Sequence, residues 1–154
     1  MTEHSTQHAT FVIERDYDAS PARVFRAFAE LDAKKQWFTG PPEWGPDEHA
    51  MDFRIGGRET NSGGPKEGPV HRFEAVYWDI VENQRIVYTY EMFLDDARIS
   101  VSLATIELKA KGKATGFRLT EQAVHLDGHD NPEQREEGTR GILDQLADAL
   151  KRGA

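Results

Sequence analysis

The sequence contains no cysteine, so disulfide bonds, thiolate metal ligands and a cysteine nucleophile are all excluded. It also has no apolar run of about 18 residues, the length that a membrane-spanning helix requires. The stretch before Phe11 is polar and lacks the apolar centre of a secretion signal. These absences predict a cytoplasmic protein that does not insert into a membrane.

Basic residues are scarce relative to acidic ones, with 19 Lys and Arg against 27 Asp and Glu and a formal net charge of -8 at pH 7. No basic run offsets this charge, so binding to a phosphate backbone is disfavoured and no nucleic-acid partner is expected. The sequence also lacks a glycine-rich nucleotide-binding motif and the Gly-x-Ser-x-Gly motif of hydrolases. His125 and His129 straddle a predicted strand end and turn instead of sharing one helix face, so we expect neither a metal nor a cofactor.

Apolar and polar residues alternate with a period of two along much of the chain, which is the pattern of half-buried strands. The first such strand covers Phe11–Tyr17, and two short helices follow it, one starting at Ser20-Pro21 and one over residues 31–37. Further strands, separated by turn residues, are predicted at Met51–Ile55, after Gly57, and at His71–Val81, Arg85–Phe93, Arg98–Leu108 and Thr115–Leu126. Short connections favour antiparallel pairing. We therefore predict one curved sheet of about six or seven strands in a single domain at residues 11–152, preceded by a disordered polar tail at 1–10.

The last predicted helix begins with Asn131 as its cap and Pro132 at its first position, and its interior contains Gly138 and Gly141. Each interior glycine costs about 1 kcal/mol relative to alanine. A helix that keeps two of them is expected to let either sheet backbone or a bound molecule approach its surface closely.

Several polar side chains are predicted to lie on the apolar face of the strands. Glu121 shares a face with Phe117 and Leu119, where it either pairs with an arginine or faces a ligand. An inward tyrosine is usually a core residue with its hydroxyl at the rim, and a histidine near a strand start is usually exposed or structural. The candidates of these two kinds are the histidine His71 and the tyrosines Tyr77, Tyr88 and Tyr90. Two tryptophans beside a loop rich in Gly and Pro, Trp37 and Trp44, are further candidates.

Short motifs in a fixed order carry a resemblance to a known family. They include Asp52-Phe53-Arg54-Ile55-Gly56-Gly57, Thr120-Glu121-Gln122 and Arg135-Glu136-Glu137-Gly138-Thr139. From about Phe11 to Leu150 the chain resembles the SRPBCC superfamily, in the branch named after activators of the heat-shock-protein-90 ATPase. The resemblance implies an α+β START-like helix-grip fold, in which a curved antiparallel sheet wraps around the long C-terminal helix. In relatives, a cavity between sheet and helix accepts lipids, polyketides or other hydrophobic molecules.

The leading hypothesis is therefore a protein that binds a hydrophobic small molecule, rather than an enzyme, and no residue is assigned a catalytic role. Glu121 and His71 would be its polar anchors, and the glycines of the last helix would leave room for the ligand. The predicted ligand-binding residues are Trp37, Trp44, Phe53, His71, Phe73, Tyr77, Tyr88, Tyr90, Glu121, Gly138, Ile142 and Leu146.

Two other functions stay open at this point. One is an enzyme of the cyclase or dehydratase type seen in some relatives, with Glu121 or His71 as general acid or base. The other is an interaction module that contacts a chaperone ATPase through its acidic surface, which would give it a place in the stress response.

Overall fold

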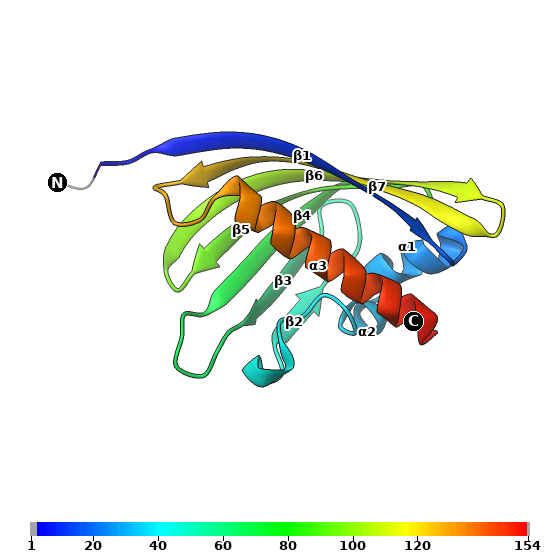
Figure 1. The fold of residues 1–154 in the computed structure, drawn as a ribbon, viewed down its shortest axis with the longest axis horizontal. Helices are drawn as coiled ribbons and strands as arrows, with labels where there is room; N and C mark the ends of the chain where they lie inside the picture. Colours follow the sequence, from blue (N-terminus) through cyan, green and yellow to red (C-terminus); the bar gives the residue numbers. More distant parts are fainter. Residues whose placement is uncertain (1–2, 154) are drawn as a thin grey trace.

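The computed structural model describes residues 3–153 and shows a curved antiparallel sheet with one long helix lying across it (Figure 1). The sheet has seven strands in the order β1-β7-β6-β5-β4-β3-β2. The strands are β1 (Thr6–Tyr17), β2 (Glu48–Met51), β3 (Arg58–Gly63), β4 (His71–Val81), β5 (Arg85–Leu94), β6 (Ala97–Lys111) and β7 (Ala114–Leu126). The helices are α1 (Pro21–Ala29), α2 (Leu31–Lys34), the 3-10 helix η1 (Pro42–Trp44) and α3 (Pro132–Lys151). This arrangement confirms the predicted helix-grip fold and the two short helices after the first strand.

Strands β2 to β7 follow one another as a meander. The first strand of the chain, β1, pairs with the last strand, β7. The tight connections depend on residues that tolerate a left-handed backbone. Asn83 joins β4 to β5 with a φ of 63°, and Asp95 joins β5 to β6 with a φ of 51°. The turns predicted between these strands therefore lie where the sequence places them.

The prediction of a disordered tail at residues 1–10 is wrong for residues 6–10, which belong to β1. Thr6 to Thr10 pair with Leu126 to Gln122 of β7, and the Asp127 carboxylate accepts a hydrogen bond from the Ser5 amide at 2.8 Å. This part of the strand carries mostly exposed polar side chains, so no apolar alternation marks it, and main-chain pairing with β7 holds it in the sheet. Residues 1–2 of the predicted tail lie outside the described residues.

The strand expected at Met51–Ile55 is also displaced, because β2 ends where that strand was expected to begin. Residues 52–57 form a turn, in which the Gly57 amide donates to the Arg54 carbonyl at 2.7 Å and Gly56 has a φ of 82°. A side chain at Gly57 would collide with the Asp52 carbonyl, so the turn requires glycine there.

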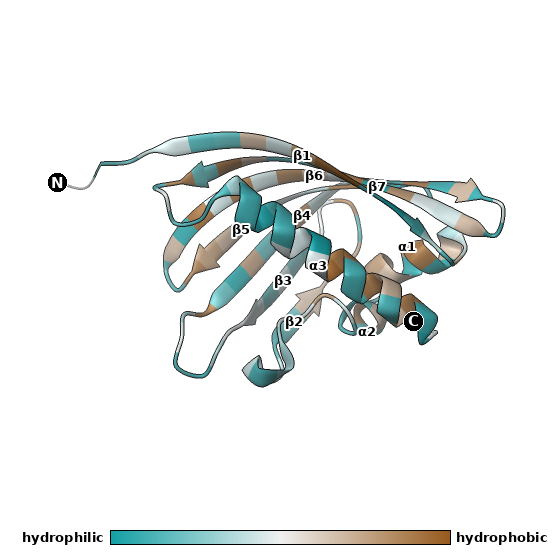
Figure 2. Ribbon diagram, in the orientation of Figure 1, coloured by the Kyte–Doolittle hydropathy of each residue, from teal (hydrophilic) through white to brown (hydrophobic). Residues whose placement is uncertain are grey.

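The C-terminal half of α3 carries most of the packing of this helix. Its buried residues are Leu143, Leu146, Ala149 and Leu150, and none lies before Leu143 in the part of the helix that the structure describes. The Tyr17 hydroxyl of β1 donates to the Leu143 carbonyl at 3.1 Å. Figure 2 shows the same division, with a hydrophilic first half of α3 and apolar residues gathered in the second. The helix is therefore fixed at one end of the sheet.

The predicted start of α3 is confirmed, since the Asn131 side chain accepts a hydrogen bond from the Gln134 amide at 2.9 Å. This cap holds the first turn, which has few apolar contacts, in helical form. Among residues 3–153, no helix is long and apolar enough to cross a membrane.

Candidate functional site

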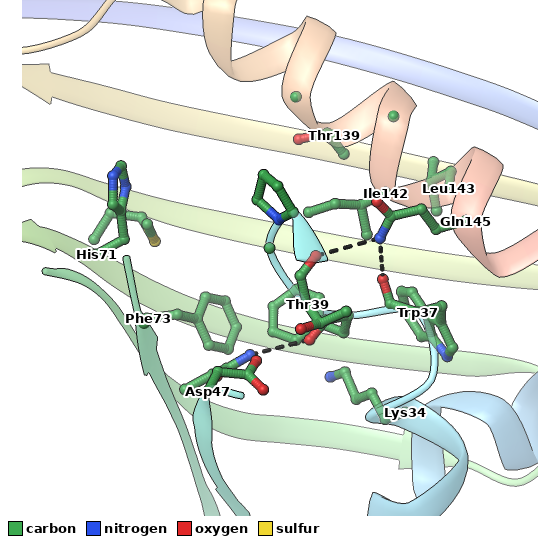
Figure 3. A pocket seen from close by; sticks show the side chains of 18 of the residues that line it. Lys34, Trp37, Thr39, Asp47, His71, Phe73, Thr139, Ile142, Leu143 and Gln145 are labelled. Atoms are coloured by element: carbon green, nitrogen blue, oxygen red, sulfur yellow. Dashed lines mark hydrogen bonds between the residues drawn. The ribbon is translucent and has the colours of Figure 1, made fainter. Parts of the chain in front are cut away.

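A cavity of about 870 Å³ lies between the inner face of the sheet, α3 and the loop at residues 38–47. This volume falls in the range of about 300–1,000 Å³ that is usual for small-molecule sites. Its deep wall consists of buried residues and its outer wall of exposed ones, so it opens to solvent beside the loop and the helix. The apolar and aromatic residues around it are Phe28, Trp37, Phe38, Trp44, Phe73, Tyr88, Tyr90, Met92, Ile106, Leu119, Ile142 and Leu143. Figure 3 labels four of them, Trp37, Phe73, Ile142 and Leu143.

Aromatic side chains form much of the wall on the sheet side. The Phe73 ring of β4 has its centroid 4.9 Å from that of Phe38 and 4.9 Å from that of Tyr90. Tyr88, two residues from Tyr90 on β5, also faces the cavity. Because these rings pack against one another in edge or tilted contacts, they hold the wall in place without a ligand.

The two interior glycines of α3 border the cavity. A Cβ atom added at Gly138 or Gly141 would meet no atom of the described chain within 4 Å, apart from the adjacent residues and backbone of α3 itself. The sheet backbone therefore does not approach the helix at these positions, which removes one of the two explanations that the sequence left open. The glycines instead keep the surface of α3 free of side chains where it faces the cavity.

The loop at residues 38–47 closes another side and is tied to the elements around it. Gln145 of α3 donates from its side-chain amide to the Trp37 carbonyl at 2.6 Å (Figure 3), and Asn61 of β3 donates to the Phe38 carbonyl at 3.1 Å. Trp44 stacks on the His71 ring with centroids 4.8 Å apart. Partial burial lowers the pKa of His71, although Asp95 opposes the shift, so the imidazole in this stack is neutral near pH 7.

A chain of hydrogen bonds crosses one end of the cavity. Tyr90 donates from its hydroxyl to Oε1 of Glu121 at 2.8 Å, and Nη1 of Arg135 donates to the Tyr90 hydroxyl at 3.2 Å. Nη2 of Arg135 donates to the Ser100 hydroxyl and to the Asp130 carboxylate, both at 2.8 Å. The guanidinium is therefore shared among three partners, and it reaches Glu121 only through Tyr90.

Glu121 is 2% exposed, and its Oε2 atom has no hydrogen-bond partner among the described residues. Burial raises the pKa of this carboxyl, although the Tyr90 hydrogen bond and the nearby Arg135 charge act in the opposite direction. The raised pKa favours a proton on Glu121 compared with an ordinary glutamate. One oxygen of a buried carboxyl group in the cavity wall is thus available for a further hydrogen bond.

A second polar cluster lies behind the opposite wall and satisfies its charges internally. Lys34, which lines the cavity, donates to Oε1 of Glu59 at 2.6 Å, and the His49 ring lies 2.6 Å from Oε2. Tyr77 donates to the same carboxylate at 2.5 Å. Burial acts to raise the pKa of Glu59, but the Lys34 charge and the three hydrogen bonds outweigh it and lower the pKa to about 2. Glu59 is therefore ionised, and the cluster has a structural role.

The two histidines singled out in the sequence do not lie in a metal-binding cluster. In the described part of the chain, no group of three or more His, Asp or Glu side chains is arranged to hold a metal ion. His125 instead has its Nδ1 atom 2.8 Å from the carboxylate of Asp130, which also binds Arg135.

A comparison with protein families identifies a family for most of this chain. The family described as activator of Hsp90 ATPase homolog 1-like protein matches residues 18–151. The chain belongs to this family. The match confirms the resemblance that the sequence motifs carry, and it covers α1, the cavity loop, six of the strands and all of α3.

Two solved structures are similar to this AHSA1-like chain over nearly its whole length. A protein from Rhizobium leguminosarum is 45% identical with a TM-score of 0.93, covering 98% of this chain and 99% of its own. A protein from Rhizobium loti is 43% identical with a TM-score of 0.87, covering 94% and 99%. The AHSA1-like protein from Aeromonas hydrophila shares the fold, with a TM-score of 0.71 at 18% identity over 94% and 93% of the two chains. Among curated proteins, none matches the sequence.

Most of the predicted ligand-binding residues of this AHSA1-like protein meet around the cavity. Those that line it are Trp37, Trp44, His71, Phe73, Tyr88, Tyr90, Glu121, Gly138 and Ile142. Three others do not. Phe53 packs edge-on against Tyr77, Tyr77 is turned toward Glu59, and Leu146 is fully buried in the core. Contact of the nine lining residues with a ligand stays a prediction.

Sequence reasoning missed several polar residues of the cavity. Arg135 lies one helical turn before Gly138, so the spacing of α3 could have placed both on one face. No sequence pattern marked Lys34 as a residue of the cavity, because a lysine in a short polar helix normally points to solvent. Gln145, which ties α3 to the loop, was equally hidden, since its role depends on a main-chain carbonyl 108 residues away.

Proposed function

We propose that this protein binds an apolar small molecule in the cavity between the sheet and α3, in the cytoplasm as the sequence predicts. The observation that carries the proposal is the cavity itself, which has the volume of a small-molecule site and walls of packed aromatic rings. The glycines of α3 add to it, because they keep space open at a cost in helix stability.

Burial of apolar surface supplies the affinity in this proposal. A guest that buries about 300 Å² of apolar area gains roughly 7 kcal/mol at about 25 cal/mol per Å², before the entropy lost on association is subtracted. Apolar burial alone therefore limits the affinity to the micromolar range at best, and the entropy lost on association weakens it further. The few polar groups in the wall would set the orientation of the guest.

The proposal is tested by filling the cavity from the helix. Gly138→Leu places a side chain where a Cβ atom meets open space, and leucine favours the helix more than glycine. We expect the variant to fold and to bind pyrene, used as a fluorescent apolar probe, at least tenfold more weakly than the original protein.

Glu137→Leu is the matched control, because Glu137 is an exposed neighbour on α3 that does not line the cavity. This control should bind pyrene like the unaltered protein. Equal pyrene affinity in all three proteins would place the probe elsewhere and contradict the proposal.

A second candidate is acid catalysis on the bound molecule, such as a dehydration or cyclisation. One observation favours it: Glu121 combines burial in the cavity wall, a raised pKa and a hydrogen bond from Tyr90, which are the properties of a general acid. The test is loss of water from a panel of aromatic β-hydroxy ketones, followed by mass spectrometry. Glu121→Gln should then bind pyrene normally and lose turnover, whereas no turnover in the unaltered protein would reject catalysis on these substrates.

A third candidate rests on the family name and on the net charge of -8. An acidic surface that contacts a chaperone ATPase would give an association that weakens as salt screens the charges. Titration of a purified Hsp90 ATPase at low and high ionic strength tests this. Absence of binding at low salt would exclude it.

A further inference from the structure

Among the charged groups that line the cavity in the described chain, Glu121 is the one with a buried side-chain oxygen that has no hydrogen-bond partner. It is 2% exposed, Tyr90 occupies its Oε1, and Oε2 has no partner in the described chain. A buried polar atom without a partner is unfavourable, and a buried carboxyl oxygen more so. Because the residue lines the cavity, a bound molecule can supply the missing hydrogen bond.

The cations of the cavity are already neutralised by neighbouring carboxylates. Arg135 binds Asp130 at 2.8 Å, and Lys34 binds Glu59 at 2.6 Å. Two further carboxylates, Glu43 and Asp47, line the outer wall. The balance of charge around the cavity is therefore negative, which opposes the entry of an anionic ligand such as a fatty acid.

A hydroxyl group suits Glu121 in either of its protonation states. If the carboxyl is ionised, Oε2 accepts a hydrogen bond from the hydroxyl. If it is protonated while Tyr90 occupies Oε1, the proton lies on Oε2, which donates to the hydroxyl oxygen. A carbonyl group can only accept, so it fits one state alone.

We propose that the ligand is an uncharged, apolar molecule carrying a hydroxyl group, and that this hydroxyl bonds to Oε2 of Glu121 at the end of the cavity where Tyr90 and Arg135 meet. This inference rests on the proposed binding function and names the chemical class of the ligand. It assigns Glu121 the role of a specificity-determining residue, while the aromatic walls supply the bulk of the affinity.

The test compares three fluorescent probes of one shape at pH 7: pyrene, 1-hydroxypyrene and pyrene-1-carboxylate. We expect 1-hydroxypyrene to bind about tenfold more tightly than pyrene, because a single hydrogen bond to a buried polar group contributes of that order. We expect the carboxylate to bind more weakly than pyrene.

Glu121→Met removes the hydrogen-bonding oxygen and keeps a side chain of similar length. It should abolish the preference for 1-hydroxypyrene over pyrene. Gln122→Met is the matched control, since Gln122 is the next residue on β7 and lies exposed on the opposite face of the sheet. This control should keep the preference.

The possible outcomes separate this inference from the proposed function. Equal affinity for pyrene and 1-hydroxypyrene, or tightest binding of the carboxylate, would overturn the hydroxyl inference and leave cavity binding intact. A preference that survives in Glu121→Met would also overturn it. Failure of all three probes to bind the unaltered protein would count against the binding function itself, and the inference would fall with it. If Glu121→Met does not fold, the order of the probes on the unaltered protein still decides.

Discussion

Two buried glutamates on the inner face of the same sheet have opposite environments. Glu59 is 1% exposed and contacts Lys34, His49 and Tyr77, so its charge is fully compensated. Glu121 is 2% exposed, its Oε1 accepts a hydrogen bond from the Tyr90 hydroxyl, and its Oε2 has no hydrogen-bond partner among the described residues. Burial acts to raise the pKa of both carboxyl groups, but the partners of Glu59 outweigh it and those of Glu121 do not, so the two pKa values move in opposite directions. The satisfied group holds the fold, and the unsatisfied one faces the cavity.

Glu59 should make the protein sensitive to acid. Its folded-state pKa of about 2 lies below the ordinary 4.5, so its contribution is present above about pH 5 and is lost as the pH falls toward 2. The difference corresponds to about 3 kcal/mol. Urea denaturation at several pH values should show a loss of stability in this window that is smaller by that order in Glu59→Gln. The exposed substitution Glu137→Gln should leave the pH dependence unchanged, and equal curves for Glu59→Gln and the unaltered protein would refute the assignment.

Glu121 should titrate in the opposite sense. Because its folded-state pKa is raised, the folded protein holds the proton more tightly than the unfolded chain, and stability decreases as the pH rises through the folded-state pKa. The side-chain carboxyl carbon of Glu121, followed by NMR, should titrate above the ordinary 4.5. Glu121→Gln should remove this part of the pH dependence. A midpoint at or below the ordinary value would show that Tyr90 and Arg135 outweigh burial.

The sequence could predict one of these glutamates and not the other. Glu121 alternates with Phe117 and Leu119 on a long strand, so its parity marks it as inward. Glu59 lies on β3, a short strand in which polar residues occupy both faces, so no apolar pattern reveals its direction. Its partner Lys34 comes from a four-residue helix and meets it only through the tertiary fold.

Among the elements, α3 combines two functions in one helix. Its second half packs into the core through Leu143, Leu146 and Leu150, whereas its first half covers the cavity and is held by polar contacts of Arg135. The first half should therefore open more readily than the second. Such opening would give a ligand a route into the cavity without disturbing the core.

Replacement of the helix glycines should stabilise α3. Gly138→Ala and Gly141→Ala introduce a methyl group that meets no atom within 4 Å, and each should raise the free energy of unfolding by up to about 1 kcal/mol. Amide hydrogen exchange should be faster before Leu143 than after it in the unaltered protein, and the double alanine variant should slow it in the first half. Uniform protection along the unaltered helix would contradict the division of α3.

The strands differ in how well the sequence pattern predicts their bounds. The strands from β4 to β7 were predicted nearly to their ends, because one face is buried and alternation is visible. The start of β1 and the position of β2 were not, since their residues are exposed or half-buried and show no clear apolar alternation. On β6, Ser100 and Ser102 lie on the inner face together with Ile106 and Leu108, so apolar alternation does not show which face of this strand is buried. The register of β6 with β5 shifts at Ile99, which no sequence pattern indicates.

At the scale of the whole molecule, the sheet and α3 are joined firmly at one end and separated by the cavity at the other. The family resemblance implied this cavity. The volume and charge of the cavity could not be predicted, because they depend on the positions of Lys34, Arg135 and the loop at residues 38–47 in the folded protein. A molecule built in this way gains stability when the open end is filled, since a ligand that needs the assembled cavity binds only the folded state.

Ligand binding should therefore raise the melting temperature of the whole protein. A ligand at about 100 times its dissociation constant adds roughly 2.7 kcal/mol to the folded state, and for a chain of this size about 1 kcal/mol shifts the melting temperature by roughly 2–4 °C. With 1-hydroxypyrene at such a concentration we expect a rise of about 5–11 °C by differential scanning calorimetry. Gly138→Leu should begin with a higher melting temperature and show a rise at most about half as large, because binding at least tenfold weaker leaves the ligand at no more than about 10 times its dissociation constant. An equal rise in Gly138→Leu and in the unaltered protein would mean that the probe stabilises the fold from another site.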